Sequence, residues 1–235
     1  LQGKAAHPDG KGLRQTVCQS FSNRSKERNT QRKEQVGMEL TERFPRETGR
    51  NYALRMLKEN IISLELAPES LISEAELAAE LGLSRTPVRE ALIELDKVQI
   101  IKIVPQKRTM VAPINYDLVD EACFMRNTLE RELVRLVCRY TNETGLFRLE
   151  ENVRLQQFYL KQSDFKKLMQ LDDNFHAILF EVAQKPQVYR LLQDITIHFD
   201  RVRWMALESV KELKIVQDHE QILEALRTRD AGQAE

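Results

Sequence analysis

The sequence has little of what marks a membrane or a secreted protein. Aromatic residues make up only 6% of its 235 residues, no apolar run approaches the length of a membrane span, and no signal peptide opens the chain. Its three cysteines, Cys18, Cys123 and Cys138, are odd in number and lack the spacing of metal sites. We therefore expect reduced thiols in a cytoplasmic protein.

The chain has no net charge and few glycines. The 36 basic residues balance 36 acidic ones, so contact with nucleic acid would need a local basic patch rather than a field of the whole molecule. Five of the eight glycines fall at or before Gly49. A glycine-poor remainder with long apolar periods predicts a mostly helical protein.

Residues 1–37 differ from the rest of the chain. They are polar, basic and without periodicity, and they cannot bury enough apolar surface to fold alone. We expect a disordered or non-native extension, with translation beginning near Met38; the alternative is a basic tail that adds non-specific affinity for DNA. The expected domains beyond it are residues 38–113 and 114–235.

A helix–turn–helix pattern follows the extension. A first helix is expected over about residues 48–63. Ser73 and Glu76 have the spacing of a capping box at the start of a second helix. That helix is expected to stop at Gly82, which suits a left-handed backbone, and Ser84 is expected to cap the third helix.

The third helix, within 84-SRTPVREALIEL-95, has two different faces. Arg85 and Arg89 lie one turn apart on one face, with Thr86 beside them, and apolar residues recur at helical spacing on the other. An arginine near a helix start can bind guanine through two hydrogen bonds or clamp phosphates, so this face predicts DNA binding. The alternative is an ordinary helical protein with two exposed arginines.

Two short β-rich runs, 100-IIKIV-104 and 109-TMVA-112, flank a polar turn and predict a hairpin. A helix–turn–helix followed by a hairpin is a winged helix. Lys107 and Arg108 at the hairpin tip would lie against phosphates or the adjacent minor groove. The predicted DNA-binding residues are Ser84, Arg85, Thr86, Arg89, Lys107 and Arg108.

The stretch 71-LISEAELAAELGLSRTPVREALIEL-95 resembles the winged helix of GntR-type bacterial transcription regulators. The match spans about residues 50–113, and it implies that Arg85 and Arg89 contact operator bases and phosphates, with the wing assisting.

Three positions depart from the family pattern. Ala75 stands where relatives often carry an arginine that reaches DNA, so the resemblance implies one contact fewer. Arg108 replaces the usual wing glycine and adds a charge, and Glu69 replaces a turn glycine.

From Asn115 onward the patterns predict only helices. They cover roughly residues 115–140, 143–161, 164–183, 186–208 and 212–230. We therefore expect a mainly α protein, with an N-terminal winged helix-turn-helix and a C-terminal all-α helical bundle.

Several polar side chains lie within the apolar stripes of these helices. Asp172 and His176 are one turn apart on one helix, and His219 lies in the last. Arg126 lies in the first, with Glu130 one turn on. Burying such groups is costly unless they serve each other or a ligand. An Asp and a His at one-turn spacing, with a His from another helix, form a ligand set that Zn²⁺, Ni²⁺ or Mn²⁺ accepts.

Each of these observations also has a simpler interpretation. Asp172 and His176 could be a buried hydrogen-bonded pair, and Arg126 and Glu130 an internal ion pair. His198, which lies within the stripe of its own helix, could be a satisfied core histidine.

The bundle looks like the all-helical effector domain of the FadR-like branch of GntR regulators, the FCD type. There, Asp-x-x-x-His on one helix and a His opening a later helix hold a divalent metal. The runs 172-DDNFH-176 and 218-DHEQILEAL-226 match this pattern and imply Asp172, His176 and His219 as ligands.

The resemblance also implies an effector. In the family, the metal and a neighbouring arginine receive the carboxylate of a small organic acid, and Arg126 in 124-FMRNTLE-130 matches that arginine. A fourth family ligand near the C-terminus has no counterpart before Glu235. Either the chain is truncated before this ligand, or water, the effector or His198 completes the metal coordination. We expect Arg126 and His198 to contact the effector.

These patterns together predict a bacterial transcription regulator. It would act as a homodimeric repressor that binds an inverted-repeat DNA operator and responds to a small organic acid. One alternative is a metal-dependent hydrolase with an Asp/His/His site, although the sequence has no glycine-rich phosphate loop, no HExxH motif and no nucleophile beside a base. The other is a regulator whose bundle only dimerises and whose metal is structural.

Overall fold

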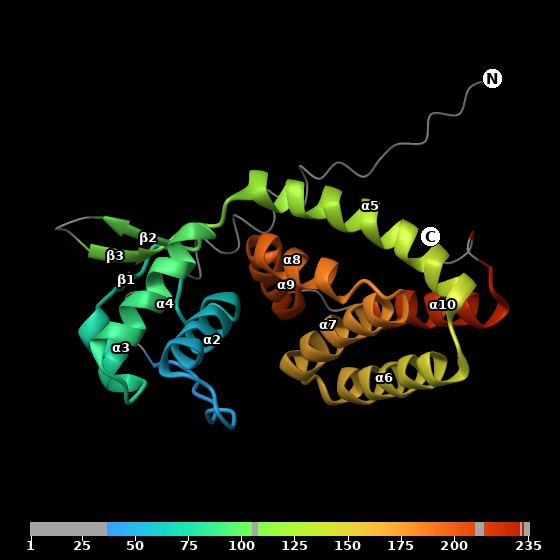
Figure 1. Ribbon diagram of the computed structural model, residues 1–235, viewed down its shortest axis with the longest axis horizontal. Helices are drawn as coiled ribbons and strands as arrows, with labels where there is room; N and C mark the ends of the chain where they lie inside the picture. Colours follow the sequence, from blue (N-terminus) through green and yellow to red (C-terminus); the bar gives the residue numbers. More distant parts are fainter. Residues whose placement is uncertain (1–36, 105–107, 210–213, 231, 233–235) are drawn as a thin grey trace, which may run out of the picture.

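The structure, a computed structural model, describes residues 37–104, 108–209, 214–230 and 232. It confirms the expected class: a winged helix-turn-helix precedes a bundle of helices (Figure 1). Among the described helices, none has both the length and the apolar character that a bilayer span requires. The predicted extension lies outside the described residues except for Gly37, as do Cys18 and Lys107.

The winged helix is built from helices packed on a small antiparallel sheet ordered β1–β3–β2. Its described elements are α2 (Gly49–Ile62), β1 (Leu71–Ile72), α3 (Glu74–Glu80), α4 (Arg85–Lys97), β2 (Ile101–Val104) and β3 (Arg108–Val111). The predicted hairpin is β2 paired with β3, where Ile103 lies opposite Thr109. The additional strand β1 was not predicted, because two residues are too short to show a period.

The helix limits follow the predicted signals only in part. Gly82 follows α3 with a φ of +64°, the left-handed conformation expected for it. Ser73 and Ser84 hold the N-cap positions of α3 and α4, but neither side chain makes a capping hydrogen bond. The capping box of Ser73 and Glu76 is therefore not formed. Burial of Leu77 stabilises α3 instead, since short helices depend on packing more than on local signals.

The bundle follows the expected limits with one exception. Its described helices are α5 (Tyr116–Tyr140), α6 (Glu143–Gln162), α7 (Phe165–Val182), α8 (Pro186–Ile195), α9 (Ile197–Ser209) and α10 (Ile215–Thr228). The prediction of one helix over 186–208 was wrong, because the chain breaks at Thr196 between α8 and α9. No glycine or proline marks this break.

The break at Thr196 turns α9 toward the winged helix. Ile197, the first residue of α9, is buried in the hydrophobic core that α2, α3, α4 and the sheet share. A second core, which includes Phe175 and Leu226, lies inside the bundle. In Figure 1, α8 and α9 stand between the winged helix and the other helices of the bundle. Burial of a side chain such as Ile197 contributes roughly 1.5–3 kcal/mol, so α9 holds the two units together.

Polar groups of α9 also hold the segment that leads from β3 to α5. The fully buried Arg201 donates from Nη2 to the carbonyl oxygen of Ala112 at 2.9 Å. The backbone N–H of Asn115 donates to Nδ1 of His198 at 3.2 Å. The predicted boundary between residues 113 and 114 falls in this segment. His198 is thus a buried histidine whose Nδ1 accepts one hydrogen bond.

His198 is expected to make stability depend on pH. Burial, helped by Arg201, lowers the pKa of its imidazole from 6.5 to about 4. Between these two values the unfolded chain takes up a proton that the folded chain does not, so stability falls as the pH falls. The wild type should lose about 2 kcal/mol through this group between pH 7 and pH 5.

A His198→Asn variant keeps an oxygen acceptor for Asn115 but cannot titrate. It should therefore lack this part of the pH dependence when the free energy of unfolding is measured in urea at both pH values. Equal losses in variant and wild type would contradict the prediction.

Candidate nucleic-acid interface and metal centre

The start of α4 presents polar and basic side chains to solvent. Ser84, Arg85, Thr86 and Arg89 are all exposed. Neither arginine has a hydrogen bond or ion pair with another residue in the part of the chain that the structure describes. The opposite face is buried through Val88, Ala91, Leu92 and Leu95. The predicted division of this helix into two faces is therefore confirmed.

Helix α4 rests on α2, which packs along it. Met56 and Leu57 of α2 are fully buried in the shared core, and Arg50 pairs with Glu94 of α4 at 3.0 Å. The orientation of the two free arginines is thus set by a packed support. At the wing, Arg108 lies in β3, but its side chain is outside what the structure describes, and its role stays a prediction.

Three predicted ligands converge inside the bundle. Asp172 and His176 come from α7 and His219 from α10, and one oxygen or nitrogen of each lies within 4.8 Å of the others. Asp172 and His219 are buried and His176 is half-buried. Helical spacing places Asp172 and His176 on the same side of α7, whereas His219 reaches them only because the fold brings α10 close to α7.

Asp172 is held in its charged form by Arg203 of α9. Its Oδ2 pairs with Nη2 of Arg203, and its Oδ1 lies 3.5 Å from Nε2 of His219. Burial raises the pKa of Asp172, but the nearby cations, above all Arg203, lower it more, so the pKa lies below its usual value. The carboxylate is therefore ionised at neutral pH, which is the form that binds a metal.

His219 is held in its neutral form. Its ring stacks on Phe175 with the centroids 4.0 Å apart, and its Nδ1 lies 2.8 Å from Oε1 of Gln156. Burial lowers the pKa of His219 to about 3, against the opposing effect of Asp172. A neutral imidazole is the form that can bind a metal ion.

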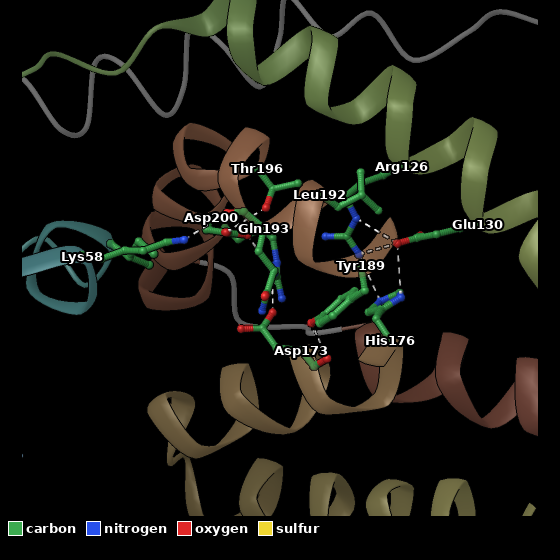
Figure 2. A pocket seen from close by; sticks show the side chains of 12 residues that line it. Lys58, Arg126, Glu130, Asp173, His176, Tyr189, Leu192, Gln193, Thr196 and Asp200 are labelled. Carbon is green, nitrogen blue, oxygen red and sulfur yellow. Dashed lines mark hydrogen bonds and ion pairs between the residues drawn. The ribbon is translucent and has the colours of Figure 1, made fainter. Parts of the chain in front are cut away.

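Arg126 of α5 lies beside this cluster. Its Nε donates to Oε1 of Glu130 at 3.0 Å, which is the internal ion pair of the simpler interpretation. Its Nη2 also lies 3.1 Å from Nε2 of His176. Figure 2 shows Arg126 and Glu130 reaching from α5 toward His176 on α7. The predicted ion pair is thus present, and Arg126 is adjacent to the candidate metal ligands.

A cavity of about 110 Å³ lies next to the cluster (Figure 2). His176, Arg126 and Arg203 line it from the bundle, together with groups of α8. Lys58 and Ile62 line it from α2 of the winged helix. The cavity therefore lies between the two units. His198 does not line it, so its predicted contact with an effector has no support from its position.

Lys58 and Arg203 are among the cavity residues that the sequence patterns missed. Lys58 lies on a helix of the other unit, and nothing in its local sequence points to the bundle. Arg203 contacts three acids. Only one of these contacts, the ion pair with Asp200 at 3.0 Å, joins residues that are close in sequence. The remaining contacts, with Asp172 and Asp173 of α7, depend on the fold.

Comparisons with known proteins match both units. Residues 51–111 match the model of bacterial regulatory proteins of the gntR family, and residues 121–235 match the FCD domain. The transcriptional repressor RspR of Escherichia coli K12 is 30% identical over 182 residues, which cover 77% of this chain and 80% of that protein. An uncharacterised HTH-type transcriptional regulator of Streptomyces ambofaciens is 30% identical over 184 residues, 78% of this chain and 77% of the other.

A solved structure has the same fold. That of E. coli McbR/YncC matches with a TM-score of 0.70 and 20% identity, over 80% of this chain and 90% of the other. The hydrolase alternative is set aside, because proteins of this kind are transcription regulators and not enzymes. The chain belongs to the GntR family of bacterial regulatory proteins and carries an FCD domain.

Proposed function

We propose that this protein is a cytoplasmic, homodimeric repressor whose affinity for an inverted-repeat operator is set by a small carboxylate bound beside a divalent metal. The observation that carries the proposal is the position of the cavity. It adjoins the Asp172, His176 and His219 cluster and is also lined by α2, which supports α4. A ligand there would contact both His176, one of the candidate metal ligands, and the DNA-binding unit.

The residues of the cluster fit a divalent cation. Oxygen and imidazole nitrogen are the donors that Zn²⁺, Ni²⁺ and Mn²⁺ accept, and three protein ligands leave positions for water or a carboxylate oxygen. The cations of the cavity, Lys58, Arg126 and Arg203, are matched by the carboxylates of Glu130, Asp173 and Asp200. Buried Asp172 adds one more negative charge, which favours a cation and opposes a free carboxylate. When bound, the metal supplies the positive charge that a carboxylate needs.

His176 links metal binding to Arg126. A guanidinium can only donate, so the contact between Nη2 of Arg126 and Nε2 of His176 uses the lone pair of the imidazole. A neutral imidazole has a single lone pair of this kind. Whichever ring nitrogen binds a metal, this hydrogen bond must break, and Arg126 then has N–H groups to offer a carboxylate. Metal and carboxylate should therefore bind with positive cooperativity.

Through Lys58, a ligand bound in the cavity would affect the DNA-binding unit. Its Nζ lies 3.2 Å from the carbonyl oxygen of Gln193 and 3.4 Å from Oδ1 of Asp194, both on α8. A ligand that attracts Lys58 competes with these contacts and favours a different placement of α2 against α8. Because α4 packs on α2, the spacing of the two recognition helices in a dimer would change with it.

The first test concerns α4. Changing Arg85 and Arg89 together to alanine should remove about 2–6 kcal/mol of operator binding, because each arginine is expected to make one charged contact with DNA. Gel retardation on DNA from upstream of its own gene, at fixed salt, measures the loss, and circular dichroism checks the fold. The control is Arg154→Ala, an exposed arginine of α6. Undiminished retention by the double variant would refute the recognition-helix assignment.

The second test concerns the metal. Protein purified without a chelator should contain about one equivalent of divalent metal per chain by elemental analysis. Asp172→Ala should lose it, because the charged ligand is gone, whereas Asp173→Ala should keep it, since this neighbour is not in the cluster. A wild type that is free of metal would rule out the metal site.

The third test concerns the effector. In the metal-loaded protein, some members of a panel of short organic acids should raise the melting temperature, because they bind only the folded chain. Arg126→Ala should abolish this rise, and Arg131→Ala, an exposed arginine of the same helix, should not. A bound metal with no response to any acid would favour the alternative of a structural metal.

A further inference from the structure

A chain of buried amides connects α7 to His219 through α6. The carbonyl oxygen of Leu171 accepts from Nδ2 of Asn152 at 3.1 Å. Oδ1 of Asn152 accepts from Nε2 of Gln156 at 2.6 Å, and Oε1 of Gln156 lies 2.8 Å from Nδ1 of His219. Asn152 is 3% exposed and Gln156 is fully buried. The two amide side chains of this relay are therefore shielded from bulk water.

The backbone carbonyl at one end fixes the direction of every bond in the relay. A carbonyl oxygen only accepts, so Asn152 must turn its NH₂ group to Leu171 and its oxygen to Gln156. Gln156 must then donate with its own NH₂ group and present its oxygen to His219. Because an amide oxygen also only accepts, His219 must donate from Nδ1.

This assignment decides which nitrogen of His219 is left for a ligand. A neutral imidazole with its proton on Nδ1 has its lone pair on Nε2. Nε2 is the nitrogen that lies 3.5 Å from Oδ1 of Asp172, within the three-residue cluster. The stacked ring of Phe175 limits rotation of the imidazole. The lone pair is therefore directed at the candidate metal position before any metal binds.

We propose that Gln156, oriented by Asn152, is a positioning residue of the metal centre, which selects the Nδ1–H form of His219 and so prepares Nε2 for a divalent cation. The inference rests on the metal site of the proposed function. A neutral amide suits this place, because a carboxylate would add a further negative charge beside buried Asp172. Groups that orient a metal-bound histidine in this way can account for a 10–100-fold change in metal affinity.

A purely structural role is the competing explanation, because the relay also ties α6 to α7 and α10. The chain offers a matched control for it. Gln157, the next residue, donates from Nε2 to Oε1 of Glu220 at 2.5 Å and so also ties α6 to α10, but on the exposed surface. A structural tie would affect stability, yet it would not change the tautomer of His219.

The experiment has two readouts on the full-length protein. The first is ¹⁵N NMR of the imidazole groups in chelator-treated protein, where wild-type His219 should have its proton on Nδ1. In Gln156→Met, which keeps the side-chain length but has no acceptor oxygen, the Nε2–H form should become populated. A wild-type His219 with its proton on Nε2 would overturn the inference even if the variant did not fold.

The second readout is affinity for Zn²⁺ alone, measured by competition with a chromophoric chelator. Gln156→Met should bind Zn²⁺ about 10–100-fold more weakly than the wild type. Gln157→Met should bind like the wild type, and Gln156→Glu, which keeps an acceptor oxygen for His219, should recover at least part of the loss. If the wild type binds Zn²⁺ and Gln156→Met binds it equally well, only the positioning role fails; if the wild type does not bind Zn²⁺, the proposed metal site itself fails.

Discussion

The buried ion pair between Asp172 and Arg203 is the interaction on which the candidate metal centre, the cavity and the position of α9 between the two units all depend. Burying two charges costs several kcal/mol per ion unless each is well paired, and removing one partner of such a pair typically costs about 3–5 kcal/mol. Here Arg203 also contacts Asp173 and Asp200, and these acids raise its pKa although burial lowers it. The pair fastens α9 to α7, so the position of α9 and the charge of a candidate metal ligand are set together.

Helix α9 contacts three parts of the molecule with residues of its first two turns. Ile197 enters the core of the winged helix, Arg201 donates a hydrogen bond to the connecting segment at Ala112, and Arg203 pairs with Asp172 of the candidate metal cluster. The two units are therefore joined by the packed contacts of one continuous helix as well as by the segment between β3 and α5.

The sequence predicted those features that local spacing determines. The two faces of α4 and the one-turn separation of Asp172 and His176 follow from helical periodicity, and the structure has both. The break at Thr196 was missed because its cause is distant, namely the burial of Ile197 in another unit. Gln156 was missed for a related reason. A glutamine in an amphipathic helix has no distinctive pattern, and only the approach of His219 from α10 gives it a partner.

The contribution of Lys58 and Ile62 to the cavity has an evolutionary consequence. This wall of the cavity belongs to the winged helix and contains none of the candidate metal ligands. Under the proposed function, relatives with the same ligand set would diverge in the acid they bind through substitutions on one face of α2. Exchanging winged helices between two such regulators would exchange part of their chemical selectivity as well as their choice of operator.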